Sequence, residues 1–194
     1  MSKKVIQIIS LILSVIGLIY LILSYYGIIR YFKLHFISTD IYTENFKNLP
    51  KASKNRVTVC FSADDKQLKN IKPFINSILD QTVRVDDIAL TIPYRDMDKI
   101  PKNLKNIISP YGYSKDYDNA GNFICSILRE PEAETKIIIV EPDKVYGEDF
   151  IENLVEESEK NPNKIIYVGK EKVGILLKPK FFNDKISDYE KGKG

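Results

Sequence analysis

Hydrophobic residues run through the first part of the chain without interruption. Residues 5–29 contain no charged side chain, and the clearly polar members are few: Gln7, Ser10, Ser14 and Ser24. A helix of this length, at about 1.5 Å rise per residue, crosses a hydrocarbon layer of roughly 30 Å with some tilt. The absence of a polar face argues against a helix packed on a soluble core. The pattern therefore predicts one transmembrane helix.

The flanks of this segment are those of an uncleaved anchor. Lysines precede it, Arg30 follows it, and tyrosines fall in its C-terminal third, as at a membrane interface. The apolar run is longer than the core of a signal peptide, and no A-x-A-like cleavage site follows it. Cationic residues are nearly balanced on the two sides, so the membrane orientation stays open. Small residues at 10, 14 and 17 form one stripe, which suggests self-association through the helix.

Beyond residue 30 the pattern changes to that of a folded domain. Residues 31–54 are polar in their second half and contain Pro50, which predicts a juxtamembrane linker. Strands and helices then alternate, which predicts an α/β fold with a mostly parallel sheet. The segment 136–140 (KIIIV) is the most apolar strand, so we expect it at the centre of the sheet, buried on both faces. The expected strands are 56–61, 87–92, 106–109 and 136–140, with helices over 68–79, 120–128 and 150–155 and a hairpin of 164–168 with 173–177.

Charge and composition exclude several classes of function. Residues 1–30 carry a net charge of +3, whereas the rest of the chain has 26 basic and 26 acidic residues. Without clustered cations, the chain is not expected to bind nucleic acid. Cys60 and Cys125 are too few for a disulfide framework and do not have metal-binding spacing. The single histidine, His35, excludes a histidine-rich zinc site.

Two strand ends carry candidate chemistry, because ligands bind at the carboxyl ends of strands in such sheets. Ser62 and Ala63 follow the first strand, and Glu141 and Asp143 follow the central one with Pro142 between them. Two acids at this spacing can face one hard divalent cation, which keeps positions free for diphosphate oxygens and neutralises charge on a leaving diphosphate. The alternative is a solvated loop with Asp143 near a helix N-terminus.

Several segments in order resemble the GT-A glycosyltransferases over about residues 55–190. They are the first strand with its Ser62 exit, NSILDQT at 76–82, IPY at 92–94, KDY at 115–117, IIIVEPDKVY at 137–146 and GILLKP at 174–179. The resemblance implies a Rossmann-like three-layer nucleotide-sugar domain over 55–194, after an anchor at 1–30 and a linker at 31–54. It also implies a lipid bilayer and a nucleotide-diphosphosugar as partners.

The resemblance further implies roles for individual residues. Asp143 would bind Mn²⁺ or Mg²⁺ at a variant of the family's DxD motif, and Glu141 would contact the ribose or a water on the metal. Ser62 and Ala63 would lie near the nucleotide. Lys115 and Asp116 would border the sugar diphosphate. No residue of this sequence is assigned as catalytic.

Departures from the family pattern leave two functions open. Pro142 stands where related sequences have an acid, and 51 residues follow Asp143, so we expect the acceptor-binding half to be missing or minimal. The first possibility is a membrane-anchored, metal-dependent glycosyltransferase. The second is a catalytically inactive, degenerate transferase domain that serves as a membrane-tethered binding or scaffold module.

Overall fold

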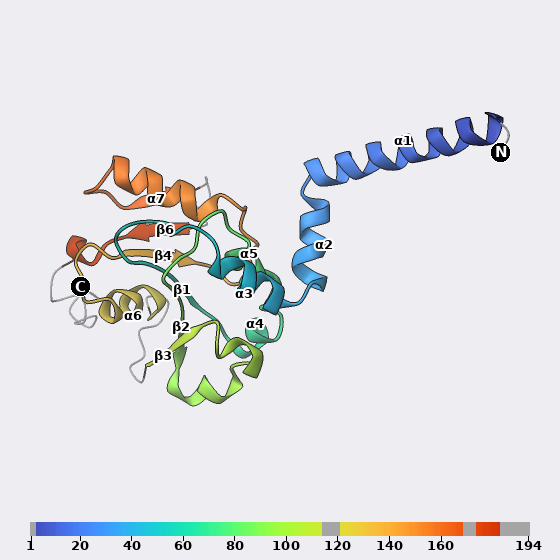
Figure 1. The fold of residues 1–194 in the computed structure, drawn as a ribbon. Helices are drawn as coiled ribbons and strands as arrows, with labels where there is room; N and C mark the ends of the chain where they lie inside the picture. Colours follow the sequence, from blue (N-terminus) through green and yellow to red (C-terminus); the bar gives the residue numbers. More distant parts are fainter. Residues whose placement is uncertain (1–2, 114–120, 169–173, 183–194) are drawn as a thin grey trace. The chain divides into compact units, whose positions relative to one another are not determined.

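A computed structural model describes residues 3–113, 121–168 and 174–182 of the chain (Figure 1). The chain forms two compact units, which we call the N-terminal unit (Met1–Ser38) and the folded unit (Thr39–Gly194). The N-terminal unit contains the long apolar helix, and the folded unit contains the sheet.

The N-terminal unit consists of two helices, α1 (Lys3–Tyr25) and α2 (Ile28–Phe36). At about 34 Å, α1 is long and apolar enough to cross a membrane. The expected helix over 5–29 ends early, at Tyr25. The reason is Gly27, whose φ of 70° lies in the left-handed region that glycine adopts without a steric penalty. Gly27 also precedes the first residue of α2, so the chain changes direction there.

The folded unit is built on a mixed sheet of six strands in the order β3-β2-β1-β4-β6-β5. β1, β2, β3 and β4 run parallel, while β6 is antiparallel to both β4 and β5. This confirms the expected α/β class, the mostly parallel sheet, the central position of β4 and the C-terminal hairpin. The strands are β1 (Val57–Ser62), β2 (Asp87–Pro93), β3 (Ser109–Tyr113), β4 (Lys136–Val140), β5 (Ile166–Val168) and β6 (Gly174–Leu177).

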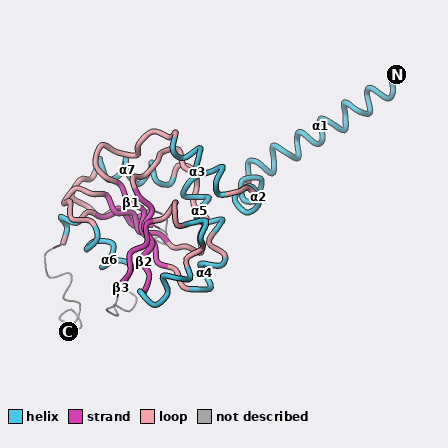
Figure 2. Tube along the Cα trace, turned by 60° about the horizontal axis from the view of Figure 1, so that its bottom comes forward, coloured by secondary structure: helices cyan, strands magenta, loops and turns pink. Residues whose placement is uncertain are grey.

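Helices cover both faces of this sheet, as the tube in Figure 2 shows. On one face, Ile127 of α6 (Gly121–Arg129) belongs to a core cluster with Cys60, Ala89 and Ile137 from three strands. On the other face lie α5 (Lys72–Leu79) and α7 (Phe150–Lys160), and α3 (Thr39–Lys47) packs against α5. The remaining helical segments in the described residues are α4 (Asp65–Lys69) and three short 3₁₀ turns at Tyr94–Lys99, Lys102–Leu104 and Pro179–Phe181.

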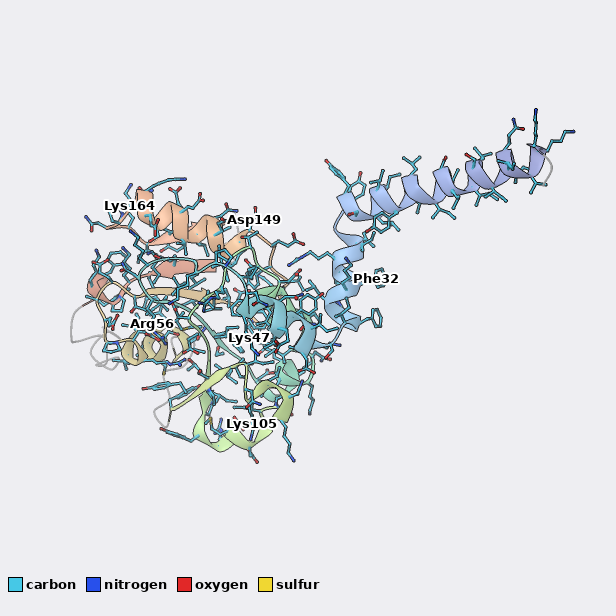
Figure 3. The ribbon with its side chains drawn as sticks, viewed as in Figure 1. Phe32, Lys47, Arg56, Lys105, Asp149 and Lys164 are labelled. Carbon is cyan, nitrogen blue, oxygen red and sulfur yellow. The ribbon has the colours of Figure 1, made fainter. Side chains whose placement is uncertain are left out.

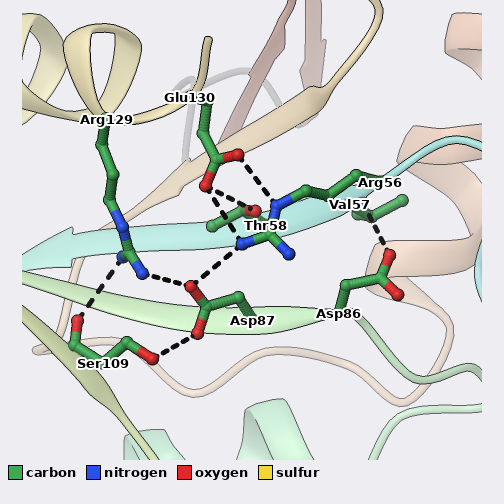
Figure 4. A network of polar contacts seen from close by, with 8 residues as sticks. All are labelled: Arg56, Val57, Thr58, Asp86, Asp87, Ser109, Arg129 and Glu130. Carbon is green, nitrogen blue, oxygen red and sulfur yellow. Dashed lines mark hydrogen bonds and ion pairs between the residues drawn. The ribbon is translucent and has the colours of Figure 1, made fainter. Parts of the chain in front are cut away.

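A buried polar network ties the amino-terminal ends of the parallel strands together (Figure 4). Arg56 donates from Nε to Glu130 Oε2 at 2.9 Å and from Nη2 to Asp87 Oδ2 at 3.3 Å. Asp87 is also paired with Arg129 and accepts from Ser109 Oγ at 2.6 Å. Glu130 is almost fully buried, so its ion pair and hydrogen bonds are needed to offset the free-energy cost of burying a carboxylate. The network therefore joins β1, β2, β3 and the end of α6.

Three sequence-based boundaries differ from the structure. Residues 31–54, expected as a linker, contain the end of α2 and all of α3, and the folded unit already begins at Thr39. The third strand lies at Ser109–Tyr113 instead of 106–109. The helix expected over 68–79 is divided into α4 and α5, because Pro73 lies in the first turn of a new helix, where its missing N–H has no consequence.

Candidate functional site

The ends of β1 and β4 form the edge of the sheet where a ligand site is expected. β1 and β4 are parallel neighbours in the sheet. The chain passes from β1 to β2 and β3 on one side of β1, whereas β4, β6 and β5 lie on the other side. The strand order therefore switches direction between β1 and β4. Ligands in open α/β sheets bind in the crevice outside the strand ends at such a switch in strand order. Since Cys60 is paired with Ile139, Ser62 and Glu141 lie at the same level, two residues further along each strand.

The residues after β1 include two exposed acids, Asp64 and Asp65, and both are already engaged. Asp65 forms an ion pair with Lys69. Ser62 is partly buried and Ala63 is buried. Asp64 accepts a hydrogen bond from the Gln67 N–H at 2.7 Å, and the Gln67 side chain accepts from the Asp64 N–H at 3.0 Å. This reciprocal arrangement is a capping box, in which Asp64 caps the first helix after β1. The β1 end therefore offers Ser62 and backbone groups to a ligand.

The loop after β4 presents two exposed carboxylates, one of which has a cationic partner. Lys144 Nζ lies 2.7 Å from Glu141 Oε2. The carboxylate of Asp143 is exposed and makes no hydrogen bond or ion pair with the described residues. A cation approaching this loop would find Asp143 available, whereas Glu141 must exchange its contact with Lys144.

Tyr146 supports this loop from within the domain. The Glu141 N–H donates to Tyr146 Oη at 2.9 Å, and the same Oη donates to the Glu141 carbonyl at 3.3 Å. Burial raises the pKa of the Tyr146 phenol to about 12, and the negative charges of Glu141 and Asp143 act in the same direction. The Tyr146 ring also packs on Phe150, with centroids 4.4 Å apart. The phenol therefore fixes the backbone from which both carboxylates project.

The end of α5 holds the same loop through buried polar side chains. Ser77 Oγ accepts from the Tyr146 N–H at 3.2 Å. Gln81 donates to the Gly147 carbonyl at 2.6 Å and accepts from the Ile151 N–H at 3.0 Å. These residues belong to the NSILDQT segment, whose contribution here is structural. Sequence reasoning assigned no role to Ser77, Gln81, Lys144 or Tyr146. Gln81 lies beyond the last residue of α5, so helical periodicity gives no signal for it.

The donors at this edge suit a metal ion that takes most of its ligands from a substrate. Among the described residues, no three histidine, cysteine or acidic side chains surround a common point. Mg²⁺ is bound in many proteins by one or two carboxylates plus waters and phosphate oxygens. Asp143, with Glu141 beside it, provides that number. The two remaining candidates, Lys115 and Asp116, lie outside the described residues.

The chain is therefore an α/β domain with a mostly parallel six-stranded sheet, an acidic loop at the switch in strand order, and an apolar N-terminal helix. No protein-family model matches the chain, and no curated protein matches its sequence.

Proposed function

We propose that this chain is a membrane-anchored, GT-A-type glycosyltransferase-like protein that binds a nucleotide-diphosphosugar together with Mn²⁺ or Mg²⁺. The observation that carries the proposal is the position of Glu141 and Asp143. They follow the buried central strand β4 at the switch in strand order, level with the end of β1.

Each residue of this edge has a role in the proposed complex. Asp143 binds the ion, which also contacts the diphosphate and compensates its charge. Glu141 contacts the ribose or a water on the metal, and Lys144 is then released to face phosphate oxygens. Ser62 and Ala63 border the nucleotide. Lys144 thereby supplies a cation close to the diphosphate, from the loop that also carries Asp143.

In this proposal, α1 remains in the mature protein as the anchor. After two lysines at its start, α1 carries no charged side chain, and none of its residues is buried, as a lipid-facing helix requires. Ser14 Oγ donates to the Ser10 carbonyl at 2.9 Å, so this hydroxyl is satisfied within the helix. A Cβ at Gly17 would meet no atom of the described residues within 4 Å. A second copy of α1 can therefore approach closely along this stripe.

The alternative is a domain of the same architecture that has lost catalysis and acts as a membrane-tethered binding or scaffold module. The observation that favours it is the ion pair of Glu141 with Lys144. This pair engages one of the two carboxylates, so metal binding must compete with it.

The test is isothermal titration of the detergent-solubilised full-length chain with UDP and GDP, with and without Mn²⁺. We expect Mn²⁺-dependent binding that Asp143→Ala abolishes and Glu141→Ala weakens less. The matched control is Asp149→Ala, which removes an exposed acid at the start of α7 that makes no capping hydrogen bond (Figure 3). Absence of nucleotide binding would favour the inactive module. Unchanged affinity in Asp143→Ala would end the metal-site assignment.

A further inference from the structure

A pocket of about 810 Å³ lies at the end of the sheet opposite to Glu141 and Asp143. It is next to the first residue of β4, whereas those acids follow the last one. Four lysines line the pocket: Lys51, Lys54, Lys136 and Lys178. Glu159 is the one acid among its lining residues in the described part of the chain. The lining is therefore positively charged, although the folded unit as a whole is nearly neutral.

Two of these lysines are buried beside each other. The side chains of Lys136 and Lys178 are 3% and 5% exposed. Ile137 is paired with Leu177 in the antiparallel ladder, so Lys136, the first residue of β4, is opposite Lys178, which directly follows β6. Like charges at such positions destabilise a sheet, and burial of an ammonium group adds a desolvation cost. This arrangement requires negative charge in or beside the pocket.

The carboxylates of the protein compensate the charge of these two lysines only in part. Lys136 Nζ donates to Ser53 Oγ at 2.6 Å and lies 3.4 Å from Glu159. Lys178 Nζ lies 3.2 Å from Glu134 and donates to a backbone carbonyl. Both glutamate side chains are more than half exposed. Water screens such pairs, so each contributes little.

Further hydrogen-bond donors in the pocket lack acceptors. Lys54 is exposed, and its ammonium group has no partner among the described residues. Ser158 is fully buried, and its Oγ has no hydrogen-bond partner within the described part of the chain. An orphaned buried hydroxyl is uncommon in a folded protein and calls for a ligand or a water. An anion in the pocket would supply an acceptor to Ser158 and charge to the lysines at once.

We infer that this pocket binds a small phosphorylated anion, with a phosphomonoester or diphosphate group held by Lys136 and Lys178 and approached by Lys54 from the rim. Lysine ammonium groups bind phosphate as point charges without a fixed fork geometry. The site needs no metal ion, and it is separate from the edge that carries Asp143. It therefore goes beyond the proposed nucleotide-sugar function and does not depend on it.

The test is isothermal titration of the full-length chain in detergent with inorganic pyrophosphate, in the presence of EDTA. We expect saturable binding that weakens as salt is added. Lys136→Met should lower the affinity by at least about tenfold, because one charge-assisted contact is lost. Lys54→Met should lower it by a few fold. The control Lys160→Met removes an equal charge from the exposed surface of α7 and should leave the affinity unchanged.

The Lys54 variant and a variant at the other edge keep the result unambiguous. Lys54 is exposed and supports no other residue in the described part of the chain, so its variant tests the pocket even if Lys136→Met does not fold. Asp143→Ala should bind pyrophosphate as the wild type does; a loss there would place the anion at the other edge and overturn the inference. Absence of saturable binding, or equal losses in the Lys54 and Lys160 variants, would also overturn it.

Discussion

Tyr146 and Glu141 hold each other by two hydrogen bonds, in which the phenol oxygen accepts from the backbone N–H of Glu141 and donates to its carbonyl. A side chain five residues further along thereby closes the loop that begins where β4 ends. In the proposed metal site, the carboxylates of Glu141 and Asp143 project from a backbone that the fold itself already fixes. Such preorganisation lowers the entropic cost of binding.

Removal of this phenol should loosen the loop without unfolding the domain. Tyr146→Phe keeps the buried ring and its packing on Phe150 but leaves the Glu141 N–H without its acceptor. We expect a loss of about 1–2 kcal/mol in the free energy of unfolding, measured by urea denaturation, and faster hydrogen exchange at the Glu141 amide. Unchanged exchange at this amide would contradict the assigned role of the phenol.

The same residue should make stability sensitive to alkaline pH. An unfolded tyrosine titrates near pH 10, whereas burial raises the pKa of the Tyr146 phenol to about 12 in the folded state. The neutral phenol therefore contributes stability that is fully present below about pH 10 and is lost as the pH rises towards 12. We expect the stability difference between wild type and Tyr146→Phe to shrink over this interval. A difference that stays constant from neutral pH to the upper end of this range would show that the phenol titrates normally.

The ion pair of Arg56 with Glu130 should stabilise the fold far more than a surface ion pair does. Glu130 is 4% exposed, so Arg56→Met leaves a buried carboxylate without its main partner. We expect a loss of about 3 kcal/mol or more in the free energy of unfolding. Lys160→Met breaks an exposed pair with Glu156 and should change it by less than about 0.5 kcal/mol. Similar effects of the two substitutions in urea denaturation would contradict the structural role of the network in Figure 4.

Gly174 should tolerate no side chain. A Cβ at this position in β6 would lie 2.4 Å from the Phe150 ring, which is buried between α7 and the sheet. Gly174→Ala should therefore destabilise the fold by about 1–3 kcal/mol through overpacking, seen as a lower melting temperature. The control is Gly147→Ala, whose Cβ would meet an exposed Asp149 oxygen at 3.3 Å, so the side chain can move away. If Gly174→Ala melts at the wild-type temperature, the ring has room to shift and the packing argument is wrong.

The sheet could be predicted from sequence mainly where burial is complete. β4 lies where a continuous apolar run predicts it, because strands buried on both faces leave a strong hydrophobic signal. The C-terminal hairpin also pairs as expected. The predicted position of β3 was wrong because its sequence, SPYGY, contains the proline and glycine of a turn. As an edge strand, β3 can include Pro110 without losing an inner ladder bond.

The candidate site was predictable only in its outline. Strand ends follow from the strands, so Ser62 and Glu141 could be placed at one edge of the sheet. The side chains that hold the loop after β4 could not be predicted, because the hydrogen bond between Ser77 and the Tyr146 N–H joins positions 69 residues apart. Likewise, α3 falls in the segment predicted as a linker because it has few apolar residues, although Tyr42 is buried. Its helical state depends on packing against α5, which local sequence does not show.

Pro110 has a consequence for how neighbouring molecules meet. The outer edge of a sheet is a template on which a strand from another chain can add, and proteins disrupt it with proline, whose nitrogen carries no hydrogen to donate. β3 forms one edge of this sheet, and Pro110 is exposed there, paired on its inner side with Leu90. In the proposed membrane-anchored state, copies of the chain would meet one another often. Because Pro110 interrupts the backbone N–H donors along β3, a strand of a second copy cannot pair fully with this edge. This opposes aggregation of the copies edge to edge.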